Sequence, residues 1–249
     1  MTGANTETEP RVGWGDALRA TLRLISFRIS QTELINLGRK HLAFGLFCAW
    51  LVGMGRYWDN PRVGLFQHLG VGSVIYVFIL SLFLWLIILP LRPKHWSYFR
   101  VLTFVSLVSA PAALYSVPVE KVFSLDTSNS INVWFLVVVA GWRVVLLVFF
   151  LRRLGKLNWF SIVIATLLPL TLIVVTLTIL NLDRVVFDIM SGVRERSPND
   201  ASYEILVWLS WLSISLFIPI LICYLGLVIS RFLASRGVVK TPNNSGRHE

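Results

Sequence analysis

The stretch VVVAGWRVVLL, residues Val137–Leu147, decides the fold class. Ten of its 11 residues suit a lipid or a protein interior, and the remaining one, Arg143, is a permanent cation. The stretch lies in an apolar run, Ile131–Leu151, that is long enough to cross a bilayer as a helix. Further runs of more than about 18 residues carry no charge, so the sequence predicts an all-α, polytopic membrane protein.

The composition supports this class. Of the 249 residues, 55% are hydrophobic and 14% are charged, whereas soluble domains contain about 25% charged residues. A net charge of +10 would suggest nucleic acid as the partner of a soluble protein. In a membrane protein the placement of the charges matters more than their sum. We therefore expect the lipid bilayer, and no nucleic acid, as the partner.

Six spans are predicted from the apolar runs. The first has only 14 residues, which reach about 21 Å of a hydrocarbon core of about 30 Å, so a re-entrant segment is the alternative. The six runs are Leu42–Gly55, Val71–Leu91, Val101–Val119, Ile131–Leu151, Trp159–Leu182 and Ile205–Ile229.

The basic residues predict the orientation of these spans. If all six cross with the N-terminus inside, 16 of the 23 Lys and Arg lie on the cytoplasmic side and six lie outside. If the first run does not cross, the division becomes 10 inside against 12 outside. The positive-inside rule favours the first arrangement. We expect both termini to be cytoplasmic, in a plasma membrane or bacterial inner membrane.

The ends of the chain differ from the spans. Residues 1–10 and 235–249 are polar and predicted to be disordered, and residues 41–234 form the predicted six-span domain. Within residues 11–40, a helical period places apolar residues on one face, with Arg19 and Arg23 off it. This segment is predicted to lie as an amphipathic helix in the membrane interface, attracted by anionic lipid. Packing on the protein's own cytoplasmic loops is an equal alternative. The apolar face consists of Trp14, Leu18, Leu22, Ile25 and Ile29.

Arg143 is the first candidate site. It lies eight residues from the end of its run at Leu151, about 12 Å along a helix and too deep for the side chain to reach water unaided. A proline within a helix leaves the carbonyl four residues earlier without its donor. We therefore expect Arg143 to donate to such a carbonyl, at Leu107 or Ala165, as a structural staple. An anion or lipid headgroup bound at Arg143 is the alternative. The other residues of this hypothesis are the prolines and their polar neighbours: Pro111, Pro169, Pro219, Ser106, Ser109 and Thr166.

Gly45, Ala49 and Gly53 form a second pattern. Small residues spaced by four allow helix backbones to approach closely in a membrane. We expect packing within the chain, and homo-oligomerisation is the alternative.

Motifs for catalysis are absent from the sequence. It contains no HExxH, GxSxG, Walker A or GxGxxG pattern. The two cysteines and four histidines have no metal-ligand spacing. We therefore expect no enzyme, no metal and no cofactor.

The third to fifth spans carry a resemblance. VLTFVSLVSAPAALYSVPV (residues 101–119) places a proline after small residues. INVWFLVVVAGWRVVLLVFFLRRLGKLNWFSIVIATLLPL (residues 131–170) then gives a span, a short basic turn and another span. This order resembles the Yip-type (Rab/Ypt-interacting protein-like) membrane family. The resemblance implies a cytosolic N-terminus, a small bundle of spans and, for the eukaryotic members, a link to vesicle traffic. The sixth span and Arg143 depart from the family's pattern, and no functional residue is carried over.

The leading functional expectation is a non-enzymatic scaffold or adaptor. It would organise protein partners or anionic lipids at the cytoplasmic face, through the N-terminal helix and the inner loops. The alternative is a small transporter or channel with Arg143 at its site.

Overall fold

The computed structural model describes residues 13–56, 64–186 and 201–237. These residues form helices and no strands, which confirms the predicted all-α class. The predictions for residues 1–10 lie outside the described residues, as do those for 238–249. The α-helices are α1 (Trp14–Ile25), α2 (Gln31–Ile35), α3 (Arg39–Gly55), α4 (Leu65–His68), α5 (Val71–Ile88), α6 (Tyr98–Leu107), α7 (Leu125–Arg153), α8 (Trp159–Ile179) and α10 (Ala201–Gly237). Three 3-10 helices connect them: η1 (Leu89–Leu91), η2 (Ala110–Ser116) and η3 (Val119–Lys121).

Five helical segments are long and apolar enough to cross a membrane, as the sequence predicts for the second to sixth runs. They are Val71–Leu91, Tyr98–Ser116, Thr127–Arg153, Trp159–Ile179 and Glu204–Ala234. The first run is helical as α3, but this helix has only 17 residues. A sixth crossing by α3 therefore stays a prediction.

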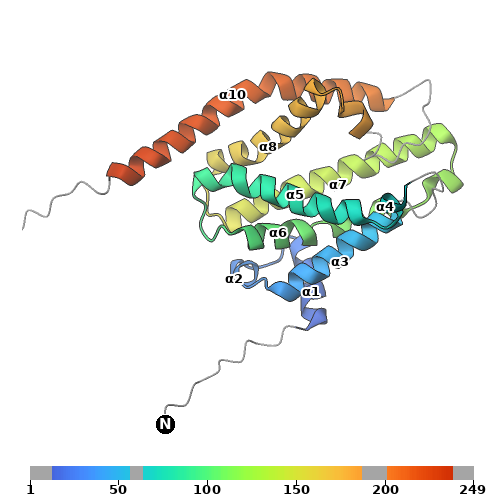
Figure 1. The fold of residues 1–249 in the computed structure, drawn as a ribbon, viewed down its shortest axis with the longest axis horizontal. Coiled ribbons are helices and arrows are strands. Elements are labelled where there is room, and N and C mark those ends of the chain that lie inside the picture. The colour runs from blue at the N-terminus through green and yellow to red at the C-terminus, as the bar shows by residue number, and fades with distance from the viewer. Residues whose placement is uncertain (1–12, 57–63, 187–200, 238–249) are drawn as a thin grey trace, which may run out of the picture.

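The helices form three groups in space. Figure 1 shows α1, α2 and α3 along one edge, α8 and α10 along the opposite edge, and α5, α6 and α7 between them. The short α6 lies at the centre, and every one of its residues from Val101 to Leu107 is buried, because α3 and α5 both pack against it. Ser97 begins this helix, and its hydroxyl accepts a hydrogen bond from the backbone N–H of Arg100.

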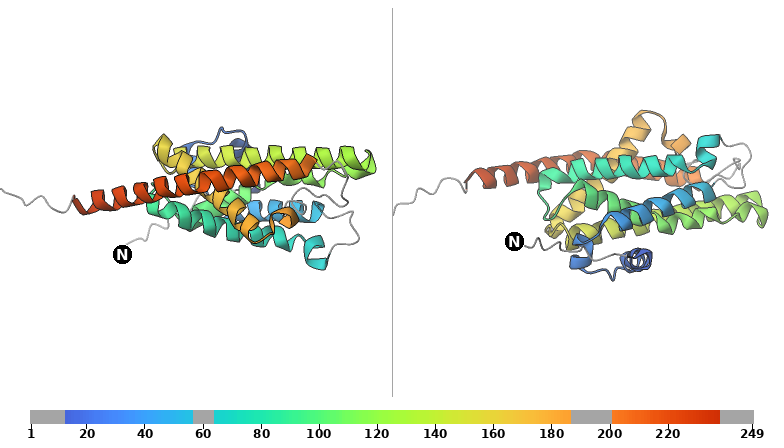
Figure 2. Two further views of the ribbon diagram at one scale, coloured as in Figure 1. Left: turned by 90° about the horizontal axis from the view of Figure 1, so that it is seen from above. Right: turned by 60° about the horizontal axis from the view of Figure 1, so that its bottom comes forward.

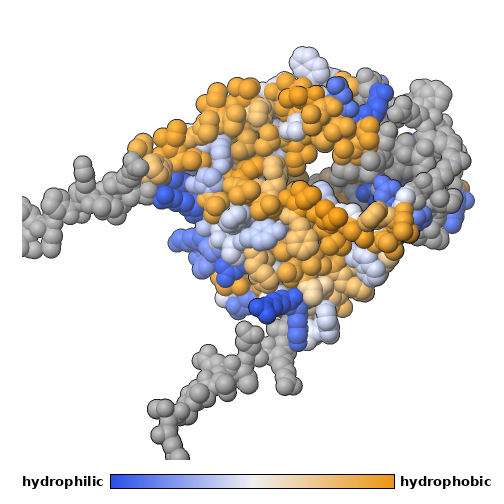
Figure 3. Space-filling view, in the orientation of Figure 1, coloured by the Kyte–Doolittle hydropathy of each residue, from blue (hydrophilic) through white to orange (hydrophobic). Residues whose placement is uncertain are grey.

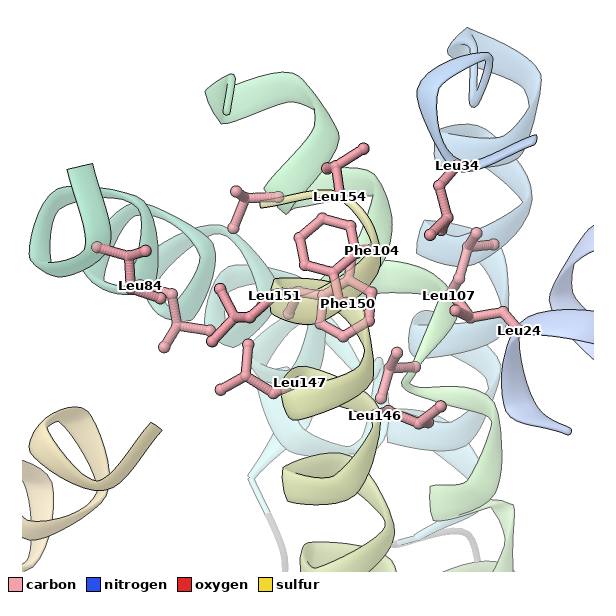
Figure 4. Close-up of a cluster of buried hydrophobic side chains, with 14 of the residues drawn as sticks. Leu24, Leu34, Leu84, Phe104, Leu107, Leu146, Leu147, Phe150, Leu151 and Leu154 are labelled. Atoms are coloured by element: carbon pink, nitrogen blue, oxygen red, sulfur yellow. The ribbon is translucent and has the colours of Figure 1, made fainter. Parts of the chain in front are cut away.

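The core lies where α6 meets the C-terminal part of α7. The rings of Phe104 and Phe150 stack with their centroids 4.1 Å apart, and leucines from several helices surround them (Figure 4). Phe150, Leu151 and Leu154 are fully buried. This cluster joins the end of α7 to the central helix and fixes the direction in which α7 leaves the core.

The α8–α10 pair is held to the rest at one end. The Tyr224 hydroxyl of α10 donates to the carbonyl of Ile87 on α5 at 2.7 Å. Within the pair, Arg231 of α10 donates to the Ser161 hydroxyl at the start of α8 at 3.1 Å. Figure 2 shows α10 as a long helix on the outside of the bundle, and most of its apolar side chains are exposed. Hydrocarbon around the protein would cover such a surface.

Polar residues collect at one end of the bundle, defined here as the basic end. Lys94 N–H donates to the carbonyl of Gly155 at 2.9 Å, and Arg100 Nε donates to the carbonyl of Ile35. These contacts join α2, the α5–α6 turn and the α7–α8 turn. Figure 3 shows the hydrophilic residues of this face gathered mainly at the lower left, where these segments lie, with apolar residues over most of the remainder. The exposed cations of the basic end and of α1 are Arg19, Arg23, Arg28, Arg39, Lys40, Arg92, Lys94, Arg152, Arg153 and Lys156.

Candidate functional site

The third span breaks in its middle. Pro111 has no N–H to continue an α-helix, and α6 ends at Leu107. After the break, Ala112 N–H donates to the carbonyl of Ser109, three residues back, at 3.0 Å. In an α-helix this N–H would donate to Val108, four residues back. The change to 3-10 geometry therefore frees the carbonyl of Val108.

Arg143 fills this gap. Its Nε donates to the carbonyl of Val108 at 3.4 Å, a long hydrogen bond. The sequence predicts Leu107 or Ala165 as the acceptor, and the structure instead uses the residue after Leu107. The reason is that Pro111 alters two hydrogen bonds, its own missing one and that of Ala112. The missing N–H of Pro111 by itself identifies only Leu107, four residues earlier, and not Val108.

None of the three predicted hydroxyl partners forms a hydrogen bond with Arg143: two donate to backbone carbonyls, and the third is buried. Ser106 donates to the carbonyl of Thr103 at 2.8 Å, and Ser109 donates to the carbonyl of Val105 at 3.2 Å. Thr166 is buried, and its hydroxyl has no hydrogen-bond partner among the described residues. The structure thus brings the break at Pro111 to Arg143 but shows no hydrogen bond between Arg143 and these three hydroxyls.

The other two prolines do not bring a carbonyl to Arg143. Pro169 is buried inside α8, which continues through it. Pro219 lies inside α10, on an exposed position. The neighbouring Ser215 donates its hydroxyl to the carbonyl of Trp211 at 2.8 Å. Their role in the structure is therefore separate from that of Pro111.

Sequence reasoning did not connect two further residues, Tyr115 and Arg56, with this part of the fold. Tyr115, in η2, interacts electrostatically with both Arg143 and Arg56. The guanidinium carbon of Arg56, directly after α3, lies 5.1 Å from the centroid of the Tyr115 ring, within the range of a cation–π interaction. Sequence position alone puts Arg56 at the outer end of the first run. No local pattern relates it to Arg143, because they belong to different helices.

The small residues of α3 face other helices of the same chain. Gly45, Ala49 and Gly53 are all buried. A Cβ on Gly45 would lie 2.9 Å from the backbone N of Leu107, and one on Gly53 would lie 2.9 Å from the carbonyl oxygen of Gly70. The stripe thus permits the close approach of α3 to α6 and to the start of α5. Its burial leaves little of this face for a second copy of the chain.

The N-terminal helix forms a second candidate site. Figures 1 and 2 show α1 running across the direction of the long helices. It packs on α3 with Ala17, Thr21 and Leu24 buried. Three of its other apolar residues face away from the protein: Trp14, Leu18 and Leu22 are 62%, 47% and 59% exposed.

Several contacts hold α1 in this orientation. The Trp142 indole N–H donates to the carbonyl of Ile25 at 3.1 Å, and the Phe27 ring stacks on Trp142. Arg153 donates to the carbonyl of Ile29. Of the predicted apolar face, Ile29 is fully buried in the core, and Ile25 is partly buried. The predicted face divides because the helix ends at Ile25 and the chain then runs along α7.

Ion pairing and burial act on the titratable groups near α1. Arg23 forms an ion pair with Glu33 of α2. The backbone N–H of Ser30, followed by Arg23, lowers the pKa of the Glu33 carboxyl. Burial lowers the pKa of His41, just before the first predicted span. The Gly38 N–H donates to its Nδ1 at 3.1 Å, which requires that nitrogen to be unprotonated.

The fold and the composition together define the class: this chain is an integral membrane protein built as a helical bundle. Comparison with protein-family models, curated proteins and solved structures finds no match. In the part of the chain that the structure describes, no three His, Cys, Asp or Glu side chains come together as a metal site. The resemblance to the Yip-type family stays a prediction.

Proposed function

We propose that this protein is a non-enzymatic membrane scaffold that gathers anionic lipids at its basic end through α1. One observation carries the proposal: α1 is fixed to the bundle by one face and holds Trp14, Leu18 and Leu22 exposed on another. An amphipathic helix with this division binds in the headgroup region of a bilayer.

Charge supports lipid as the occupant of this face. Arg19 and Arg23 lie on α1, and the exposed cations of the basic end surround the same side of the protein. Each Lys or Arg close to an anionic surface contributes about 1 kcal/mol of attraction. The cytoplasmic leaflet is the anionic one, so the proposal includes the orientation predicted from the loops, with both termini cytoplasmic. It also includes, from the sequence resemblance alone, kinship with the Yip-type family.

Reconstitution into proteoliposomes tests the scaffold function. Energy transfer between headgroup-labelled phosphatidylglycerol molecules reports their clustering around the protein. We expect clustering with the wild-type chain and its loss in Leu18→Glu and in the double variant Arg19→Gln/Arg23→Gln. Trp208→Ala is the matched control, because Trp208 is also exposed but lies on α10. Equal clustering in all variants refutes the proposal. Cross-linking of a protein to α1, without an effect on lipid, would assign this face to a protein partner instead.

A small transporter or channel is the second candidate. The observation that favours it is the placement of a cation, Arg143, at a break in the third span. Flux of a radiolabelled anion into proteoliposomes, lost in Arg143→Gln, would support transport. The absence of flux for a panel of anions would leave the scaffold as the function.

A further inference from the structure

Two turns of the basic end are joined directly to each other. One turn, residues 92–97, leads from η1 to α6, and the other, residues 154–158, leads from α7 to α8. The backbone N–H of Lys94 donates to the carbonyl of Gly155 at 2.9 Å. A Cβ on Gly155 would lie only 3.2 Å from the Cβ of Pro93, so the two turns approach closely. Lys94 and Lys156 therefore belong to one junction of the backbone, and both are exposed.

The junction carries positive charge without a compensating acid. Residues 89–100 and 150–160 contain six Lys and Arg and no Asp or Glu. The ion pairs between the described residues are Arg19–Asp16 and Arg23–Glu33, and neither involves these two turns. Like charges on adjacent turns repel each other. An anion supplied from outside the chain would offset this repulsion.

Three residues of the two turns have a backbone conformation that favours glycine. The φ angles of Arg92, His95 and Lys156 are 47°, 52° and 47°. Glycine adopts this left-handed region without a steric penalty, whereas other residues do so at a cost. Strained backbone of this kind collects at functional sites. The chain thus holds a basic side chain at three positions where glycine would fit the backbone better, and a role in binding explains this choice.

Exposed aromatic rings adjoin the junction. Trp159 and Phe160, at the start of α8, are 63% and 53% exposed, and Lys156 lies three residues before Trp159. Aromatic side chains collect at the headgroup level of a bilayer, where the phosphate groups of lipids also lie. The rings therefore favour a lipid over a free anion as the source of the negative charge.

We propose that this junction binds an anionic lipid that carries two phosphate groups, with Lys94 and Lys156 as phosphate ligands. Each turn supplies an exposed cation, so paired phosphates neutralise both turns and a single phosphate neutralises only one. Basic pockets between membrane helices on the cytoplasmic side bind headgroups of this kind. The inference rests on the orientation in the proposed function, which puts the basic end at the anionic leaflet, but its residues are separate from α1.

Native mass spectrometry of the detergent-purified chain tests the site. The probes are cardiolipin, which has two phosphates, and phosphatidylglycerol, which has one, offered in competition. We expect the wild type to retain cardiolipin preferentially, and Lys94→Gln/Lys156→Gln to retain about tenfold less of it, since two cations next to the phosphates are lost. Arg28→Gln/Arg39→Gln is the matched control, because it removes two exposed cations outside the two turns.

Lys156→Gly separates binding from folding. Glycine fits the φ angle of 47° at this position, so the variant should melt no lower than the wild type while it retains less cardiolipin. A lysine that only shapes the turn predicts unchanged retention, and that result would overturn the site.

Three further outcomes decide the inference. Equal retention of the two lipids by the wild type overturns it, and so does a control variant that loses as much cardiolipin as Lys94→Gln/Lys156→Gln. A melting temperature that rises with inorganic pyrophosphate, without a preference for cardiolipin, assigns the turns to a free anion and overturns the lipid site.

The scaffold function is judged separately, by the clustering of phosphatidylglycerol through α1. Cardiolipin retention that depends on Lys94 and Lys156, without such clustering, supports the site and refutes the scaffold. Clustering through α1 without a preference for cardiolipin supports the scaffold and refutes the site.

Discussion

Gly45→Ala tests the close approach of α3 to α6, on which the central packing depends. The added Cβ would lie 2.9 Å from both the N of Leu107 and the carbonyl carbon of Ser106, whereas ordinary contacts begin near 3.4 Å. The nearest atom met is the hydroxyl oxygen of buried Ser106, and the next two are backbone, so α6 or α3 must move by about half an ångström. Overpacking of this kind costs about 1–3 kcal/mol. The gain in helix propensity from Gly to Ala returns up to about 1 kcal/mol.

Because backbone atoms cannot rotate away from the added Cβ, we take the upper part of that range, about 2–3 kcal/mol, and expect a net loss of about 1–2 kcal/mol in the free energy of unfolding. For a chain of this size that corresponds to a melting temperature lower by about 2–8 °C. The assay is thermal unfolding in detergent, followed by circular dichroism. Gly141→Ala is the matched control, because a Cβ at Gly141 of α7 meets nothing within 4 Å. A Gly45→Ala chain that melts no lower than Gly141→Ala would refute the close α3–α6 packing.

Two further predictions concern the core and the pH dependence. Phe150→Ala removes a fully buried ring from the stack with Phe104. The loss of stability should approach but not exceed about 3–5 kcal/mol, because lipid is as apolar as the core. Phe160→Ala, at an exposed position, should cost far less in the same thermal assay. His41 has a pKa lowered from its usual 6.5 by burial, so the unfolded chain binds a proton more readily than the folded chain. Stability should fall as the pH drops below about 6.5, and His41→Gln should flatten this slope in a melting series from pH 8 to pH 5. An unchanged slope would show that His41 does not titrate as its burial implies.

Much of the fold follows from the sequence because apolar runs and helix hydrogen bonds are local. The boundaries of α5 with η1, Val71–Leu91, match the second predicted run. The break at Pro111 is also local, since a missing N–H acts within four residues. The hydrogen-bond acceptor of Arg143 cannot be predicted locally. It depends on which face of α7 packs against η2 and on the 3-10 geometry of η2 around Pro111. The packing of α1 could not be predicted from the sequence either. The helical period predicts one apolar face, but packing on α3 and α7 buries part of that face and leaves the rest exposed.

The amino-acid sequence by itself determined that the chain is helical, lies in a membrane and carries a cation within its fourth apolar run. Hydropathy and charge are properties of short segments, so they can be read from the sequence without knowing which helices pack together. Only the tertiary structure decided that Arg143 donates to the carbonyl of Val108 and that α1 turns Trp14, Leu18 and Leu22 away from the bundle. Those relations arise from the packing of helices distant in the chain, where shape and close backbone approach select one arrangement among many that the same hydropathy pattern allows.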